Sequence, residues 1–572
     1  MPTVLAAIDP VTRIEGHLRI ELETDNGRIT NAWAAATQFR GIEKVLAGRD
    51  PRDAWAFAQR ICGVCTTVHA IASVRAVEDA LKYPIPRPAE LLRNLVVGMA
   101  TLQDHVIHFY HLHALDWVDV VSAMQADPEA TARLAASLSP WPGNGVARFR
   151  DVQRRVKESV AGGQMSIFTN GYWGHPAYKL PPEANLLALT HYLEALPWQR
   201  EIIRFHAILG GKNPHPNFLV GGMACAINLD NPQTLNTVTL TQLAGYIRQA
   251  RQFVEEVYLP DVLAIAGFYP EYGAIGTSSP NLLAVGEVGY ASAGPPAGEV
   301  KPGVLLGGDY RTVHPFDPQK IAEFIASAWY SYPDGDRASR HPWQGETTPR
   351  YTGPKPPYQL LSDQPKYTWV KAPRYGGKPV QVGPNARLLV AYAQGHAPTV
   401  KLVDETLTRL GLTPASLTST LGRTLARALE SVLLAQRMET WFAELAERIK
   451  AGEISTFNPD RWDPGSWPPS AQGVGFLEAA RGTLSHWLTI EGGKVKQYEC
   501  VVPSTWNGSG RDAEGQLGPY EQALAGDGRH PLADPKRPLE VLRKVHSFDP
   551  CMSCAVHLVD ARGTSLGEVK VS

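Results

Sequence analysis

The chain contains 572 residues, of which 44% are hydrophobic and 19% charged, and its formal net charge at pH 7 is −1. This length exceeds the usual single-domain size of roughly 100 to 200 residues and allows a large buried core. Because the charges nearly cancel, the composition offers no basic surface for nucleic acid or for an anionic membrane. We therefore expect a compact globular protein that does not bind nucleic acid.

The sequence pattern gives no sign of a targeting segment. No apolar stretch reaches the roughly 18 to 20 uncharged residues that a membrane-spanning helix needs. Residues 1–13 have neither the basic start nor the apolar core of a signal peptide. We expect the chain to carry no export signal or membrane anchor of its own.

The first predicted element is a β-hairpin. Residues 11–23 and 28–33 alternate between apolar and polar side chains on either side of an Asn26-Gly27 turn. Near Pro88 the apolar spacing becomes helical, which predicts a helix from there to about residue 124. The same spacing predicts further helices over residues 145–161, 183–209 with an interruption at Pro197, 233–258, 319–331, 385–411 and 416–451.

The remaining segments predict loops and a second β region. Residues 267–318 and 333–383 are rich in Pro, Gly and Tyr, which is typical of ordered surface loops. After Arg481, residues 487–490 and 495–502 flank a Gly492-Gly493 turn and predict two strands. Residues 556–572 resemble another short hairpin. The fold class is therefore α+β and mainly helical, with a long central helix bundle and small hairpins near both ends.

Four of the six cysteines form two Cys-x-x-Cys pairs, Cys62/Cys65 and Cys551/Cys554, near opposite ends of the chain. Two thiolates at this spacing chelate one metal, and four suit zinc, iron-sulfur clusters or nickel alike. A structural zinc site and a thioredoxin-like dithiol are the alternatives. Zinc ribbons place their pairs some 15 to 20 residues apart, and neither pair here follows a strand-to-helix redox pattern. We expect the terminal hairpins to bring the two pairs together.

Eight segments along the chain, two of which contain the cysteine pairs, form an ordered set: residues 9–17, 40–43, 60–69, 104–117, 213–217, 478–487, 502–507 and 549–557. In this order they resemble the signatures of the large subunits of [NiFe] hydrogenases. The resemblance spans essentially the whole chain and is greatest to the respiratory uptake type. It implies a catalytic subunit that oxidises H2 reversibly to protons and electrons.

The resemblance also implies a role for each cysteine of the pairs. Cys62 and Cys551 would be terminal nickel ligands, whereas Cys65 and Cys554 would bridge nickel to iron. A bridging thiolate shares its lone pairs with two metals, so a terminal thiolate should be the better base. We therefore predict that Cys551 accepts the proton released from H2.

Glu15 would then be the first proton relay from that cysteine. From the residues alone, a salt bridge with Arg13 or a buried, hydrogen-bonded carboxylate is the alternative, because an unpaired buried carboxylate is costly. Only the resemblance to the family favours the relay.

The iron of the family carries carbon monoxide and two cyanide ligands, which need an apolar pocket with a few donors. Arg481 and Ser504 are suitable donors. Asp104 and Asp549 would hold the Arg481 guanidinium over the open coordination site. The family often has Pro before this Arg, where this chain has Ala480. The predicted neighbours of the metal ligands are His69, Pro503, Ser504 and His215.

A magnesium or similar ion is also implied. Glu43 and His557 would supply side-chain ligands and Cys500 its backbone carbonyl, since carboxylates and carbonyls suit a hard cation. Cys500 then needs no thiol role, and Cys225 is interpreted as a buried apolar residue.

Several histidines at helical spacing raise the alternative of a second metal site. They are His69, His105, His108, His111 and His113. We expect instead that they are hydrogen-bonded core histidines, and that His69 donates a hydrogen bond to a bridging sulfur.

The resemblance also indicates partners and processing. With four thiolates assigned, no cysteine set remains for an iron-sulfur relay, so electrons must leave through an iron-sulfur small subunit in a heterodimer or a dimer of heterodimers. Residues 1–557 would form one catalytic domain, and a maturation endopeptidase would remove residues 558–572. The small subunit's twin-arginine signal would place the complex on the periplasmic side of the cytoplasmic membrane, with a cytochrome b or quinone-linked anchor; a cytoplasmic location is the alternative.

Two rival functions remain. A quinone-reductase subunit related to the hydrogenases is one, but such chains lack the paired cysteines. A zinc-stabilised, non-enzymatic interaction protein is the other, and it predicts zinc rather than nickel and iron.

Overall fold

The structure is a computed structural model that describes residues 4–39, 41–169, 171–286, 288, 300–345, 348–353, 360–526 and 531–555. About 49% of the chain is helical and 16% lies in strands, which form several small sheets. The prediction of a mainly helical chain with small sheets is therefore confirmed. Within the described ranges, no helix combines the length and apolar character needed to cross a bilayer.

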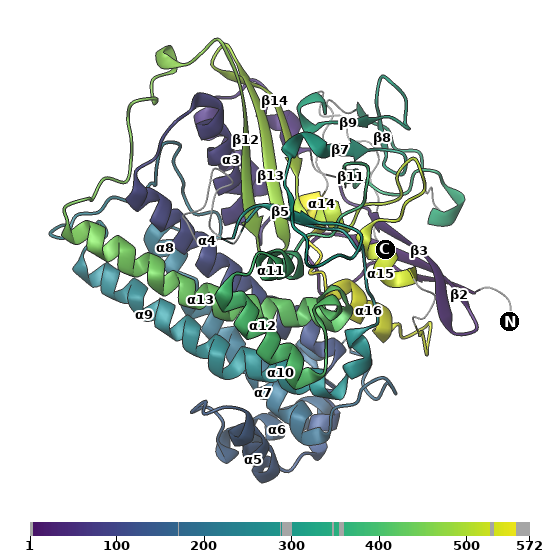
Figure 1. The fold of residues 1–572 in the computed structure, drawn as a ribbon. Helices are drawn as coiled ribbons and strands as arrows, with labels where there is room; N and C mark the ends of the chain where they lie inside the picture. The colour runs from purple at the N-terminus through teal and green to yellow at the C-terminus, as the bar shows by residue number, and fades with distance from the viewer. Residues whose placement is uncertain are drawn as a thin grey trace.

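Long helices pack side by side in the lower half of the molecule (Figure 1). They are α4 (Arg87–Ile107), α7 (Pro182–Ile202), α9 (Thr237–Phe253), α10 (Leu259–Phe268) and α13 (Thr420–Lys450). Leu421, Leu425 and Leu429 of α13 are buried because they recur on its core-facing side at helical spacing. Each such side chain contributes roughly 1.5 to 3 kcal/mol when fully buried. Helix α4 carries Asp104 towards the cysteines.

The predicted N-terminal hairpin is present, but its first strand is shorter than expected. Strands β2 (Leu18–Asp25) and β3 (Arg28–Ala36) meet at a turn in which Asn26 and Gly27 both have positive φ. Strand β1 (Val4–Ile8) pairs with the other edge of β2. Residues 11–16 do not belong to the sheet, and Glu15 instead forms a bridge with Cys551.

The C-terminal sheet holds the first cysteine pair in place through one helix. Strands β12 (Ser470–Ala479), β13 (Gly482–Glu491) and β14 (Lys494–Val501) form an antiparallel meander against α3 (Thr66–Leu81). A Cβ on Gly473 would lie 2.2 Å from the Ala76 carbonyl oxygen, and one on Gly475 would lie 1.9 Å from that of Ala72. These glycines therefore allow the strand to reach the helix backbone. Neither β12 nor α3 was predicted.

One predicted helix, over residues 319–331, is wrong. The segment contains strands β7 (Ile321–Phe324) and β8 (Tyr330–Ser331), and β7 pairs with β11 (Ala372–Tyr375). Burial alternates along β7, as a strand requires, so sheet pairing overrides the helical spacing of its apolar residues.

Other predicted helices needed adjusted boundaries. The helix predicted from Pro88 ends at Ile107 and continues as a π-helical turn, His108–His113. Helix α7 runs through Pro197 and ends before α8 (Arg204–Gly210). The segment 385–411 is two helices, α11 (Pro384–Ala393) and α12 (Ala397–Leu410), separated by Gly395 in a left-handed conformation.

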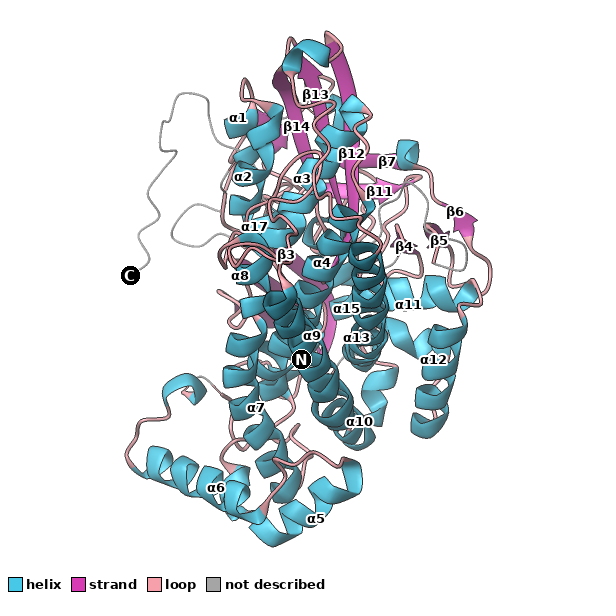
Figure 2. Ribbon diagram, turned by 90° about the vertical axis from the view of Figure 1, so that its left-hand side faces the viewer, coloured by secondary structure: helices cyan, strands magenta, loops and turns pink. Residues whose placement is uncertain are grey.

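The remaining elements are short or peripheral. The other α-helices of the described residues are α1 (Ile42–Leu46), α2 (Ala54–Ala58), α5 (Pro128–Leu138), α6 (Val146–Ala161), α14 (Pro503–Asn507), α15 (Pro519–Ala525), α16 (Leu539–His546) and α17 (Met552–Ala555). The other strands are β4 (Leu282–Ala284), β5 (Gly303–Leu305), β6 (His314–Pro315), β9 (Ser339–Arg340) and β10 (Thr348–Pro349). Helices α5 and α6 project from one end of the molecule (Figure 2).

The two Pro- and Gly-rich stretches are only partly at the surface. Strand β4 is fully buried and so is β11, so both stretches contribute to the core. The predicted hairpin at residues 556–572, His557 and the extension 558–572 lie outside the described residues.

Candidate metal centre

The two cysteine pairs meet in the structure. The Cys65 and Cys554 sulfurs are 2.8 Å apart, those of Cys551 and Cys554 3.0 Å, and those of Cys62 and Cys551 3.4 Å. All four cysteines are free thiols rather than disulfides. Four soft donors converging from opposite ends of the sequence form a compact site for a soft or borderline metal.

Local structure explains how each pair reaches the site. Cys65 directly precedes the first residue of α3, and Cys551 directly precedes the first residue of α17. The backbone of Glu15 holds the second pair from the other side, because its amide donates to Pro550 and its carbonyl accepts from Met552. Gly16 allows this approach, since a Cβ there would lie 2.5 Å from the Ser553 nitrogen.

Burial makes negative charge costly at these sulfurs. Cys62, Cys551 and Cys554 are each at most 2% exposed. Burial raises the pKa of the Cys551 and Cys554 thiols well above the usual range. Four thiolates therefore need a multivalent cation beside them, and this donor set fits the nickel and iron that the resemblance implies.

Arg481 covers one side of the sulfurs. Its Nη2 lies 3.0 Å from Asp549 Oδ1, and its Nη1 lies 3.4 Å from Asp104 Oδ2. Its Nε also donates to the Asp549 carbonyl. Burial raises the pKa of Asp104 to about 7, although the Arg481 charge opposes the rise. The guanidinium is fixed mainly by Asp549, with Asp104 as a second, longer contact.

A small cavity of about 10 Å³ lies between the sulfurs and Arg481. Apolar groups of Val68, Leu484 and Pro503 line it beside the Arg481 and Ser504 side chains. The Ser504 hydroxyl oxygen also accepts the Cys551 amide. An apolar wall with two polar side chains suits small ligands that accept hydrogen bonds.

Glu15 lies beside the second pair. Its Oε2 is 3.3 Å from the Cys551 sulfur and accepts the Ser553 amide at 3.0 Å. The Ser553 hydroxyl continues the contacts to Gln38 Oε1 at 3.1 Å. Burial, and then the negative charge at Cys62, raise the pKa of Glu15. Arg13 instead pairs with Asp116, so Glu15 is not its salt-bridge partner.

Glu43 lies in a buried acidic cluster that the sequence did not reveal. Lys371 Nζ is 3.0 Å from Glu499 Oε2 and 3.3 Å from Glu323 Oε2. Burial raises the pKa of Glu43 well above its usual range, and the neighbouring Glu499 charge adds to this effect. Glu323 Oε1 has no hydrogen-bond partner among the described residues. Three carboxylates facing one ammonium are the donor set of a hard cation.

Comparisons with known proteins agree with this geometry. Residues 40–557 match the family model described as nickel-dependent hydrogenase, and residues 6–39 match one described as HoxL-like. The chain is 49% identical to the uptake hydrogenase large subunit of Bradyrhizobium diazoefficiens, over 99% of this chain and 97% of that one. It is 46% identical to the hydrogenase-1 large chain of Escherichia coli, over 99% and 96% of the two chains. The chain belongs to the nickel-dependent hydrogenase family.

Solved structures share the fold of this hydrogenase. The reduced Ni-Fe-Se hydrogenase of D. vulgaris Hildenborough superposes with a TM-score of 0.75 at 31% identity, covering 97% of this chain and 100% of that one. The chain is thus the large subunit of a [NiFe] hydrogenase, an oxidoreductase acting on H2, and the family implies a small-subunit partner. The quinone-reductase and zinc-protein alternatives are set aside on this evidence.

The clustered histidines of the hydrogenase are hydrogen-bonded within the core. His105 Nε2 lies 2.8 Å from Glu430 Oε2, His108 Nε2 donates to the His546 carbonyl, and His111 Nε2 to that of Tyr192. His69 Nε2 is the exception, since it lies 3.3 Å from the Cys554 sulfur. Burial lowers the pKa of His69 to about 4, so its ring is neutral.

His113, Asp116 and His546 are close enough to suggest a second metal site. The Asp116 carboxylate, however, accepts from Arg13, from His113 Nδ1 and from His546 Nδ1. On its other side, His546 Nε2 lies 2.8 Å from the Thr12 carbonyl oxygen. The donors of this cluster therefore face a carboxylate rather than a shared metal position. Its hydrogen bonds connect the segment before Glu15 to the segment before Cys551.

Two further residues singled out in the sequence are His215 and Cys225. The His215 ring contacts the Cys62 backbone, and the His215 amide donates to the Thr66 hydroxyl. Cys225 is partly buried, and burial raises its thiol pKa to about 12.

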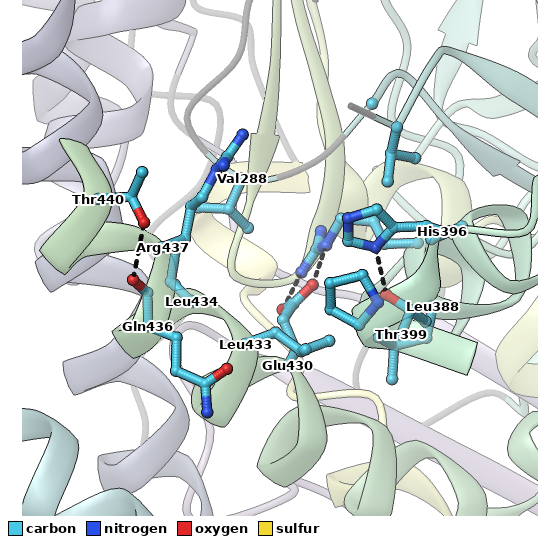
Figure 3. Close-up of a pocket in the computed structure, with 15 residues that line it drawn as sticks. Val288, Leu388, His396, Thr399, Glu430, Leu433, Leu434, Gln436, Arg437 and Thr440 are labelled. Atoms are coloured by element: carbon cyan, nitrogen blue, oxygen red, sulfur yellow. Dashed lines mark hydrogen bonds and ion pairs between the residues drawn. The ribbon is translucent and has the colours of Figure 1, made fainter. Parts of the chain in front are cut away.

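A larger cavity, of about 200 Å³, lies away from the cysteines between α11, α12 and α13 (Figure 3). The buried Arg387–Glu430 ion pair lines the cavity, and so does His396, which is hydrogen-bonded to Thr399. Val288 and Val300 flank residues that the structure does not describe. The cavity is not part of the metal centre.

Proposed function

We propose that this chain cleaves H2 heterolytically at a Ni-Fe centre in which Cys62 and Cys551 bind nickel alone and Cys65 and Cys554 bridge nickel to iron. The observation that supports this most is the convergence of four buried sulfurs with a carboxylate, Glu15, 3.3 Å from one of them. When bound, the two metals supply a redox-active electrophile that polarises H2 and takes up its electrons.

The chain's own groups then handle the proton. Cys551 accepts it on sulfur, because a terminal thiolate keeps more basicity than a bridging one. Glu15 Oε2 receives it next at hydrogen-bonding distance, and the raised pKa of the buried carboxyl favours its protonated form. The Ser553 hydroxyl and Gln38 offer the following contacts.

Arg481 and Ser504 hold the iron side of the site in this proposal. Carbon monoxide and two cyanides on iron would lie against the apolar wall beside the sulfurs and would accept hydrogen bonds from these two side chains. Asp549 and Asp104 fix Arg481 over the sulfurs, where its charge offsets that of the thiolates.

Glu43, the Cys500 carbonyl and His557 would bind a magnesium or similar ion. The buried excess of carboxylates around Lys371 supports a cation there, and Glu323 and Glu499 extend the proposed site. The role of His557 rests on the family resemblance.

Partners and processing complete the proposal. Residues 1–557 act as one catalytic domain, and a maturation endopeptidase removes residues 558–572. Electrons leave through iron-sulfur clusters of the small subunit, in a heterodimer or a dimer of heterodimers. The complex lies on the periplasmic side of the cytoplasmic membrane through the partner's twin-arginine signal and a cytochrome b or quinone-linked anchor, with a cytoplasmic complex as the alternative. Mass spectrometry of the intact, active large subunit tests the removal of residues 558–572: an active protein that retains them would contradict this part of the proposal.

The decisive experiment is metal analysis of the purified heterodimer together with H2-dependent dye reduction. We expect one nickel and one iron per large subunit, beyond the iron of the partner, and H2-dependent reduction. A Cys551→Ser variant should lose both. Zinc alone without dye reduction would overturn the proposal.

A further inference from the structure

A buried chain of hydrogen-bonding groups ends on one of the four sulfurs. Cys554 Sγ lies 3.3 Å from His69 Nε2, and His69 Nδ1 lies 3.0 Å from His486 Nε2. The other nitrogen of His486, Nδ1, lies 2.7 Å from the Tyr498 hydroxyl. His69, His486 and Tyr498 are at most 3% exposed. Three side chains from α3, β13 and β14 therefore connect the sulfur to a phenol through an unbroken, buried path.

The direction of every hydrogen bond in this chain follows from its sulfur end. A metal-bound Cys554 is a thiolate and can only accept, so His69 carries a proton on Nε2, the nitrogen that faces the sulfur. His69 Nδ1 is then an acceptor, which requires a proton on His486 Nε2. His486 Nδ1 becomes an acceptor in turn, and the Tyr498 hydroxyl is the donor that fills it. The Tyr498 hydroxyl thus holds His486 in the tautomer with its proton on Nε2, and His486 in turn holds His69 in the tautomer with its proton on Nε2.

We propose that His486 and Tyr498 are positioning residues that hold His69 in the tautomer that donates to Cys554. The proposal rests on the proposed metal centre and adds two residues to it. A hydrogen bond to a metal-bound thiolate withdraws electron density from sulfur and thereby from the metals. These hydrogen bonds therefore make the Cys554 sulfur a weaker base and a weaker electron donor.

The hydrogen bond from His69 also makes the two cysteines of the second pair unequal in basicity. Cys554 faces a donor, whereas Cys551 faces the carboxylate of Glu15 at 3.3 Å. The proton from H2 then has one preferred sulfur, and that sulfur is the one beside the relay. The hydrogen-bond chain would support this selectivity from the opposite side of the site.

Variants of the purified heterodimer separate hydrogen-bond donation from packing. His486→Leu removes the donor, whereas His486→Gln places an amide N–H near the position of Nε2. Tyr498→Phe removes only the outermost hydroxyl. His206→Leu is the matched control, because His206 is equally buried and donates to the Val96 carbonyl, in α4 and away from the sulfurs. Nickel and iron content, infrared bands of the iron-bound CO and CN groups, and H2-dependent dye reduction are measured for each.

We expect His486→Leu to keep its metals, to shift the CO and CN bands to lower wavenumber, and to lose about 10- to 100-fold in activity. Tyr498→Phe should shift the bands in the same direction by less. His486→Gln should return them towards the wild-type positions, and His206→Leu should leave them unchanged.

Several results would overturn the inference. One is an unshifted spectrum in metal-loaded His486→Leu; another is an equal shift in His486→Gln or in His206→Leu. If His486→Leu does not fold, unshifted bands in metal-loaded Tyr498→Phe lead to the same conclusion. A wild-type protein without nickel or these bands would instead refute the proposed metal centre, so the two failures are distinguishable.

Discussion

Replacing Glu15 by Gln tests the proton path most directly. The amide is nearly the same size as the carboxylate, and its oxygen can still accept the Ser553 amide that Glu15 Oε2 accepts at 3.0 Å. It cannot take a proton from the Cys551 sulfur 3.3 Å away. The variant should therefore fold and bind its metals while losing the relay.

The size of the loss follows from the role assigned to the carboxyl. A positioned general base contributes about 10² to 10⁴ in rate, which corresponds to about 3 to 5 kcal/mol of barrier. We expect H2-dependent dye reduction to fall by this factor and H/D exchange with solvent to fall with it. Nickel and iron content should remain at wild-type levels.

The assay is exchange between D2 gas and water, followed by mass spectrometry, on the metal-loaded heterodimer. Glu129→Gln is the control, because Glu129 is exposed and pairs with the exposed Arg150. Full H/D exchange in Glu15→Gln would refute Glu15 as the relay. Loss of metal in the same variant would show that the carboxylate supports the site rather than the proton path.

Four further changes test other parts of the structure. Burial opposes ionisation of Glu430, but the Arg387 guanidinium outweighs burial and lowers the pKa of Glu430 from 4.5 to about 2. Above pH 4.5 this ion pair therefore contributes about 3 kcal/mol to the free energy of unfolding. That contribution is lost as the pH falls towards 2. Urea unfolding between pH 3 and 7 should show a weaker pH dependence in Glu430→Gln, and an unchanged profile would contradict the assignment. In thermal melts, Gly475→Ala should destabilise the protein by several kcal/mol, because its Cβ would lie 1.9 Å from the Ala72 carbonyl oxygen. Its control is Gly245→Ala in α9, where the new Cβ meets open space. That variant should be more stable than the wild type by about 0.5 to 1 kcal/mol. Glu323→Gln should reduce the magnesium content of the purified protein without changing its nickel; equal magnesium would remove Glu323 from the proposed site. Asp116→Asn should cost about 3 kcal/mol in urea unfolding, since it removes the buried carboxylate that pairs with Arg13 and accepts from His546. A wild-type midpoint would refute this.

Local sequence patterns predicted the elements that local interactions determine. The Asn26-Gly27 turn and the helical spacing within α6, α9 and α13 require no knowledge of distant residues. Helix α3 was missed because it is buried almost all round, so it lacks the polar face that marks a surface helix. The 319–331 segment was misassigned because β7 is defined by its pairing with a strand about fifty residues later.

The candidate site divides in the same way. Each Cys-x-x-Cys pair is visible in a few consecutive residues, and so is the Arg481 segment. Glu323, Glu499 and Lys371 carry no such signal, because an acidic residue within a strand reads as exposed until a neighbour shows that it is buried. His486 and Tyr498 share this property: the strand pattern places each on a face of the sheet, but the contact with His69 depends on how β13 meets α3.

What turns these local signals into a site is a set of contacts between the two ends of the chain. Cys62 and Cys551 are 489 positions apart, and Glu15 and Cys551 are 536 apart. Closing loops of this length costs only about 0.6 kcal/mol more for each doubling, but it constrains where the intervening helices and sheets must lie. The glycines of β12 bring the first pair in on α3, and Gly16 admits the second pair beside Glu15. The thiolates gain a metal only when both approaches are complete, so substitutions at Gly475 or Gly16 should reduce nickel content even though neither residue touches a sulfur.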